Sequence, residues 1–206
     1  MSDTGNALLT NKNGSTGLAS NVRLPGEVGI WIFIFGDLII FSLFFGTFMF
    51  YRSQDPALFT SSQATLTQTL GVVNTVLMLT SSWFVAMAVS ATRKGMTRVP
   101  SMLLMLAFAC GLGFGLIKYV EYSAKFKMGI YPVTNDFYMY YFVFTGIHFF
   151  HVLIGMGILA FFTRYCFVRN GTFSDNDICN LECGALFWHV VDLLWIVLFA
   201  LLYLVK

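Results

Sequence analysis

Ionisable side chains interrupt long apolar runs of this sequence, and they are the residues best suited to do chemistry. Asp37 is the only charged residue between Val28 and Tyr51, and His148 and His151 stand three positions apart in a later apolar run. A charged side chain at the centre of a bilayer costs roughly 2.5–3.5 kcal/mol on insertion scales. Each of these residues therefore needs a structural or a chemical reason for its position.

Two more pairs of polar residues have the i, i+3 spacing that places side chains on one face of a helix. His189 and Asp192 form the first pair, and Glu182 precedes His189 by one heptad on the same face. We expect His189 to hydrogen-bond with Glu182 or Asp192. Lys118 and Glu121 form the second pair, nearer the end of an apolar run, where a lysine can extend its amine to the membrane interface.

Asp37, His148 and His189 are expected at a similar depth, because each lies well inside a helix that rises about 1.5 Å per residue. A layer of hydrogen bonds that holds the helices together is one explanation. The functional alternatives are a proton relay, a metal or haem site, and a lipid head-group site. With three histidines in the chain, a catalytic metal centre is disfavoured. The number of histidines is sufficient for a haem held by His148 and His189, but no other ligand signature accompanies these two residues. We expect no metal site and no catalytic residue.

The composition defines the environment of these residues. The 206 residues are 57% hydrophobic and 11% charged, with a mean hydropathy of +0.75, whereas a soluble domain has about 25% charged residues. Most of the surface is therefore expected to face lipid. The net charge of +2 is too small to indicate a nucleic-acid partner.

Five apolar runs predict the elements that position the polar residues. Each run reaches the ~20 residues that a helix needs to cross the hydrocarbon core, and the fourth is long enough to tilt or to extend beyond the bilayer. The sequence thus predicts an all-α integral membrane bundle of five transmembrane helices, at Val28–Tyr51, Leu70–Thr92, Val99–Tyr122, Phe137–Phe167 and Leu181–Leu204. The GxxxG spacing of Gly111 and Gly115 permits close helix contact, and Asn74 can hydrogen-bond across helices.

The chain divides into a polar tail and a membrane domain. Residues 1–24 include a Gly-, Ser- and Asn-rich stretch and are expected to form a disordered cytoplasmic tail, followed by the membrane domain at 25–206. An excess of basic residues marks the cytoplasmic side of membrane proteins. On the side of the N-terminus the chain has Lys12, Arg23, Arg93, Lys94, Arg98, Arg164 and Arg169, against Arg52, Lys125, Lys127 and Lys206 on the other. We therefore expect a cytoplasmic N-terminus and an external C-terminus.

Five segments, in order, resemble the C-terminal five helices of haem-copper oxidase (cytochrome c oxidase) subunit III. They are GIWIFIFGDLIIFSLFFGTF at 29–48, NTVLMLTSS at 74–82, KYVEYSAKF at 118–126, FTGIHFFHVLIG at 144–155 and ECGALFWHVVDLLW at 182–195. The patterns His-x-x-His-Val-x-x-Gly and Glu-x-Gly…Trp-His-x-x-Asp-x-x-Trp are specific in combination. The resemblance covers about Leu24 to Lys206, and it is to the short bacterial form without the two N-terminal helices of seven-helix members.

The resemblance implies a non-catalytic subunit in the bacterial inner membrane, part of a hetero-oligomer. Such a subunit has no haem or copper, packs against the catalytic haem-copper subunit I, encloses phospholipid, and supports proton uptake and stability during turnover. The family's buried carboxylate corresponds to Asp37, where many relatives have Glu. The other corresponding positions, expected to be buried, structural or close to lipid, are Asn74, Glu121, His148, His151, Glu182, Trp188, His189 and Asp192.

Two other functions stay open. The segment LPGEVGIWIF at 24–33 and the surroundings of Lys118 and Glu121 also resemble a branch associated with nitric oxide reductase, which implies an accessory role in denitrification. A self-contained membrane enzyme or proton-coupled transporter is the other alternative. The expected spans have no interior proline, whereas many transporters have Gly- or Pro-interrupted helices in corresponding halves.

Overall fold

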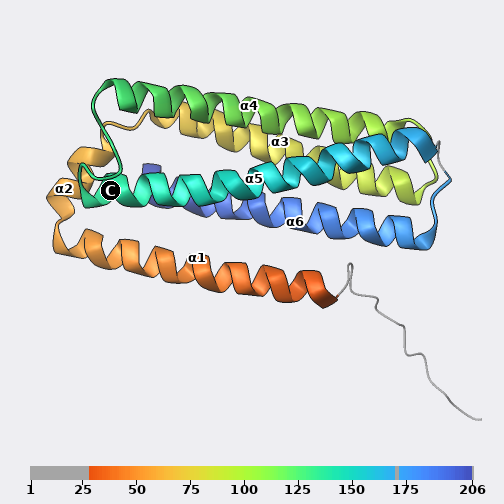
Figure 1. Ribbon diagram of the computed structural model, residues 1–206, viewed down its shortest axis with the longest axis horizontal. Coiled ribbons are helices and arrows are strands. Elements are labelled where there is room, and N and C mark those ends of the chain that lie inside the picture. Colours follow the sequence, from red (N-terminus) through yellow and green to blue (C-terminus); the bar gives the residue numbers. More distant parts are fainter. Residues whose placement is uncertain (1–27, 170–171, 206) are drawn as a thin grey trace, which may run out of the picture.

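The computed structural model describes residues 28–169 and 172–205, which are mostly helical and include no strand (Figure 1). The elements are α1 (Val28–Gln54), α2 (Pro56–Gln63), α3 (Gln68–Arg93), α4 (Val99–Lys127), α5 (Asp136–Arg169), α6 (Asp175–Phe199) and the π-helical turn η1 (Ala200–Leu204) that continues α6. Within the described residues, five helices are long and apolar enough to cross a membrane, and the short α2 is not among them. The predicted all-α fold with five membrane-spanning helices is confirmed.

The local sequence explains several helix boundaries. Pro56 opens α2 after Asp55, whose carboxylate accepts a hydrogen bond from the Leu58 amide at 3.0 Å. Gly95 and Gly129 follow α3 and α4 with φ angles of 67° and 74°. Glycine adopts this left-handed conformation without the steric cost that other residues incur, so it ends a helix readily.

Helix α5 is the longest element, as the sequence predicts. Its 34 residues extend over about 51 Å at 1.5 Å per residue, whereas the hydrocarbon core is only ~30 Å thick. The helix therefore tilts in the bilayer or continues beyond it.

Helices α3 to α6 pack together as a bundle, and α1 runs along the side formed by α5 and α6 (Figure 1). Only 17% of the residues in the most apolar stretch of α1 are buried inside the protein. In the corresponding stretch of α6 and η1, 56% of the residues are buried. Helix α6 is thus the centre of the bundle, and α1 is peripheral to it.

The alternating direction of the long helices places their connections at two ends (Figure 1). The start of α1 and the α3–α4 and α5–α6 connections lie at one end, and α2 and the C-terminal turn lie at the other. Which end faces the cytoplasm stays a prediction. The predicted tail at 1–24 and Lys206 lie outside the described residues.

Candidate functional site

Asp37 on α1 and His151 on α5 face each other across the boundary between these helices. The carboxylate Oδ1 lies 3.2 Å from the imidazole Nε2, and each side chain is 12% exposed. The second ring nitrogen, Nδ1, lies 2.8 Å from the carbonyl oxygen of Ile147, one turn earlier on α5. A carbonyl oxygen only accepts hydrogen bonds, so Nδ1 has the proton and donates it.

This geometry lets Asp37 and His151 share one proton in two arrangements. With Nδ1 protonated, Nε2 either accepts a hydrogen bond from a neutral carboxylic acid or, once protonated, donates one to the carboxylate. Both arrangements have a net charge of zero. A pair of this kind therefore suits the interior of a bilayer, where an uncompensated charge is costly.

A second buried group joins α4 to the C-terminal turn η1. The amine of Lys118 lies 2.8 Å from Oε2 of Glu121 and donates to the Tyr203 hydroxyl at 3.0 Å. Tyr203 in turn donates to Oε1 of Glu121 at 2.6 Å. Lys118 and Glu121 are each 3% exposed, and the amine also lies 4.8 Å from the centre of the Trp195 ring. The three side chains close a ring of hydrogen bonds inside the protein.

The prediction that Lys118 extends to the membrane interface is therefore wrong. The register of α4 directs Lys118 into the bundle. Lys118 lies on the same face of the helix as the buried Gly111, which contacts α5 and α6. The buried residues of this face recur at alternating spacings of three and four: Leu104, Ala107, Gly111, Phe114, Lys118, Glu121 and Lys125. This spacing is the sequence signal that identifies the buried pair, because it continues the inward face of the helix.

Glu182 and His189 on α6 both bind residues of α3, but they do so separately. Glu182 pairs with the guanidinium of Arg93 at 2.8 Å, and Nδ1 of His189 lies 2.5 Å from the hydroxyl of Ser82. The prediction that His189 hydrogen-bonds with Glu182 or Asp192 is wrong. The imidazole turns toward α3 rather than along its own helix.

Trp188 on α6 contacts three other helices, α3, α4 and α5. Its indole Nε1 donates to the Ser81 hydroxyl on α3 at 3.1 Å, and its ring lies over Gly155 on α5 and Gly111 on α4. A Cβ atom at Gly155 would lie 2.6 Å from this ring, and one at Gly111 would lie 3.2 Å from it. The close contact expected at Gly111 is thus confirmed. The absence of a side chain at Gly155 leaves the space that the Trp188 ring occupies.

Asn74, His148 and Asp192 are also buried, and Asp192 lies against Ser82, the partner of His189. Among the residues that the structure describes, neither amide atom of Asn74, neither ring nitrogen of His148, nor Oδ1 of Asp192 has a hydrogen-bond partner. The His148 ring packs against Phe114 and Trp195, with centroid distances of 5.7 and 5.3 Å. His148 and His151 therefore share a helix but contact different neighbours.

The polar residues thus form separate pairs rather than one layer across the bundle. Asp37 joins α1 to α5, whereas His189 joins α6 to α3. In the described ranges, 28–169 and 172–205, no three His, Cys, Asp or Glu residues gather in an arrangement that could hold a metal ion. The geometry favours stabilisation of the bundle and the holding of a proton by the Asp37–His151 pair.

The sequence is similar to those of known proteins along most of its length. The sequence model of the family described as Cytochrome c oxidase subunit III matches residues 12–206. Cytochrome c oxidase subunit 3 of Alkalihalophilus pseudofirmus is 27% identical over 181 residues, which cover 86% of this chain and 85% of that protein. The subunit of the same name from Synechocystis is 30% identical over 176 residues, with coverage of 85% and 74%. Cytochrome bo(3) ubiquinol oxidase subunit 3 of Buchnera aphidicola is 27% identical over 183 residues, with coverage of 85% and 92%.

Proposed function

The chain belongs to the cytochrome c oxidase subunit III family, and we propose that it is a non-catalytic subunit of a respiratory haem-copper oxidase. In this function it binds and stabilises the catalytic subunit in the membrane, holds phospholipid and supports proton uptake during electron transport. The observation that best supports the proposal is the mutual pairing of intramembrane groups, Asp37 with His151 and Lys118 with Glu121. The bacterial relatives favour the bacterial inner membrane as its location.

We assign the haem and copper of the complex to the partner subunit. A redox metal site needs ligands that converge on one point. His148, His151 and His189 instead contact separate neighbours: aromatic rings, the Asp37 carboxylate and a serine hydroxyl. This divergence supports a subunit without a cofactor of its own.

The Asp37–His151 pair is the element through which we expect the chain to assist proton uptake. It can hold a proton without net charge, and both side chains keep a small exposed fraction of 12%. Such a pair can exchange its proton with water or with a group of the catalytic subunit at the same depth. A pair that was fully enclosed would have no route for this exchange.

Purification of the tagged full chain from its native membrane in mild detergent tests the proposal. We expect a haem-copper catalytic subunit in equimolar amount, identified by mass spectrometry, and haem absorbance that follows this partner when the complex is dissociated. A Soret band, or one metal ion per chain by elemental analysis, that remains with the isolated chain would contradict a non-catalytic role. Recovery of a nitric oxide reductase in place of an oxidase would assign the chain to the alternative branch.

A further inference from the structure

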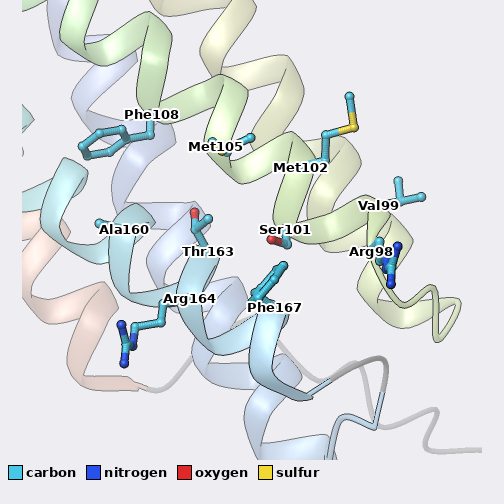
Figure 2. A pocket seen from close by; sticks show the side chains of 10 residues that line it. All are labelled: Arg98, Val99, Ser101, Met102, Met105, Phe108, Ala160, Thr163, Arg164 and Phe167. Carbon is cyan, nitrogen blue, oxygen red and sulfur yellow. The ribbon is translucent and has the colours of Figure 1, made fainter.

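Two cavities at the sides of the bundle differ in what their linings bring together. A groove of about 660 Å³ lies between α4 and α5, and most of its lining is apolar. Its two arginines, Arg98 and Arg164, lie on opposite sides of the groove and point apart, so they do not converge on one ligand (Figure 2). A cavity of about 320 Å³ between α3 and α6 has titratable groups of both helices in its lining.

The α3–α6 cavity extends from an exposed ion pair to a half-buried histidine. Arg93 and Glu182 line its outer end, and the side chain of Arg93 is 59% exposed. His189 also lines the cavity, two turns of α6 or about 10 Å further along the helix. The volume accommodates several water molecules, each of which takes ~30 Å³ in the liquid. Solvent at the end of the bundle can therefore reach the imidazole.

Beyond the cavity, three side chains form a continuous polar chain. Nδ1 of His189 lies 2.5 Å from the hydroxyl of Ser82, and the carboxyl group of Asp192 lies against the same hydroxyl. Asp192 is 5% exposed, and its Oδ1 has no hydrogen-bond partner among the residues that the structure describes. The chain thus connects an imidazole at the cavity with a carboxyl group inside the bundle, and it ends there.

The hydroxyl of Ser82 can point its proton in two directions, and each direction defines a state of the chain. When Asp192 is ionised, Ser82 donates to the carboxylate and accepts from Nδ1–H of His189, which leaves Nε2 as an acceptor. When a proton binds to Nε2, the Nδ1 proton passes to the serine oxygen and the serine proton passes to Asp192. The imidazole and the carboxylic acid are then both neutral, and the net charge of the chain has risen by one.

The other charged side chains next to α6 have partners of their own. They are Arg93 with Glu182, Asp37 with His151, and Lys118 with Glu121. His151 stacks on Phe187, which is two residues from His189 and therefore about 200° away around α6. None of the ion pairs in the described part of the chain includes Asp192. A proton is thus the cation that this carboxylate can bind.

We propose that Ser82, His189 and Asp192 form a proton-storing site, distinct from the Asp37–His151 pair, that is filled from the α3–α6 cavity. Nε2 of His189 takes a proton from solvent that enters the cavity, and Asp192 holds one at the inner end. Because the chain ends at Asp192, the site takes up and returns protons through the same opening and does not conduct them through the bundle. This inference deepens the proposed support of proton uptake, since it names a second group that stores a proton.

Infrared difference spectroscopy of the full chain in bilayers tests the inference after a rapid drop in pH. Protonation should add a carboxylic C=O band that Asp192→Asn removes, whereas Asp37→Asn should leave that band in place. Ser82→Ala breaks the chain and should slow the appearance of the band about tenfold or more, because a positioned side chain accelerates proton transfer by ~10²–10⁴. Ser82→Thr keeps a hydroxyl and should restore the rate.

Two further variants separate the polar chain from the stability of the bundle. Thr80→Ala removes a hydroxyl of α3 that bonds only within its own helix, to the Val76 carbonyl oxygen at 2.7 Å, and should leave the rate unchanged. Ala86→Phe fills the cavity and should slow proton uptake as Ser82→Ala does.

Three results would overturn the inference. They are an unchanged rate in Ser82→Ala, equal slowing in Thr80→Ala, and no band from Asp192 at any pH at which the chain stays folded. The measurement uses the full chain without its catalytic partner. Failure to recover an oxidase with the chain would therefore contradict the proposed function and leave this result standing.

Discussion

Oδ1 of Asp37 lies 3.2 Å from Nε2 of His151, and this contact fastens the peripheral helix α1 to the central bundle within the membrane. A second polar contact lies near the other end of α1, where Arg52 donates to the carbonyl oxygen of Val205 at 2.7 Å. Between these contacts α1 adheres through aromatic side chains such as Phe48, which is fully buried. The Asp37–His151 contact is therefore the position at which substitution reports most directly on the attachment of α1.

Asp37→Asn should preserve assembly and cause a modest loss of stability during turnover. The amide can still donate to Nε2 of His151, but it cannot release a proton. Asp37→Leu removes every polar contact and leaves a ring nitrogen unpaired, at a cost of about 1–3 kcal/mol, so α1 should attach more weakly. Yield of the purified complex and the lifetime of oxidase activity measure the two effects. Complete loss of the complex in Asp37→Asn, at unchanged expression, would indicate an essential ionised contact instead.

Lys118→Met should destabilise the bundle strongly, because it leaves the Glu121 carboxylate buried without its cation. Breaking one side of a buried ion pair costs about 3–5 kcal/mol. The double variant Lys118→Met/Glu121→Gln removes both charges and should recover most of the lost stability, with the Tyr203 hydroxyl still able to bond the amide. Thermal unfolding in detergent compares the two. A double variant as unstable as the single one would show that the pair is not the source of the effect.

Gly155→Ala should lower stability through steric conflict with Trp188. The added Cβ would lie 2.6 Å from the indole ring, and such overpacking costs about 1–3 kcal/mol. Gly157→Ala is the matched control on the same helix, since a Cβ there meets nothing within 4 Å. This control should be neutral or slightly stabilising, because alanine favours a helix over glycine. Equal melting temperatures of the two variants would contradict the contact.

The topology prediction concerns which end of the bundle faces the cytoplasm. The excess of Lys and Arg at the end that includes Arg93, Lys94 and Arg98 favours a cytoplasmic position for that end. Alkaline phosphatase fused after Lys206 should then be active, because it folds outside the cytoplasm, and a fusion within the α3–α4 connection near Gly95 should be inactive. The reverse pattern of activity would place the C-terminus in the cytoplasm.

The sequence predicts the helices well and their polar partners poorly, for physical reasons. Apolar runs of ~20 residues have few alternatives in a bilayer, so length alone defines a span. The partner of Asp37, in contrast, depends on which helices become neighbours, and this depends on packing contacts such as Phe48 of α1 against Phe144 of α5. The sequence shows only local spacing, which pairs His189 with residues of its own helix, whereas its partner Ser82 comes from α3.

The contact between Asp37 and His151 also has a consequence for synthesis, because its two residues are made at different times. Asp37 belongs to the first span, and His151 lies in the fourth, more than a hundred residues later. At a synthesis rate of ~5–20 residues per second, the first span waits several seconds or longer for its partner. During this interval Asp37 is without its imidazole in or beside the bilayer, where a charge is costly. Variants that slow translation between the two spans should therefore expose the nascent chain to quality-control proteases, and a membrane insertase that shelters α1 should protect it.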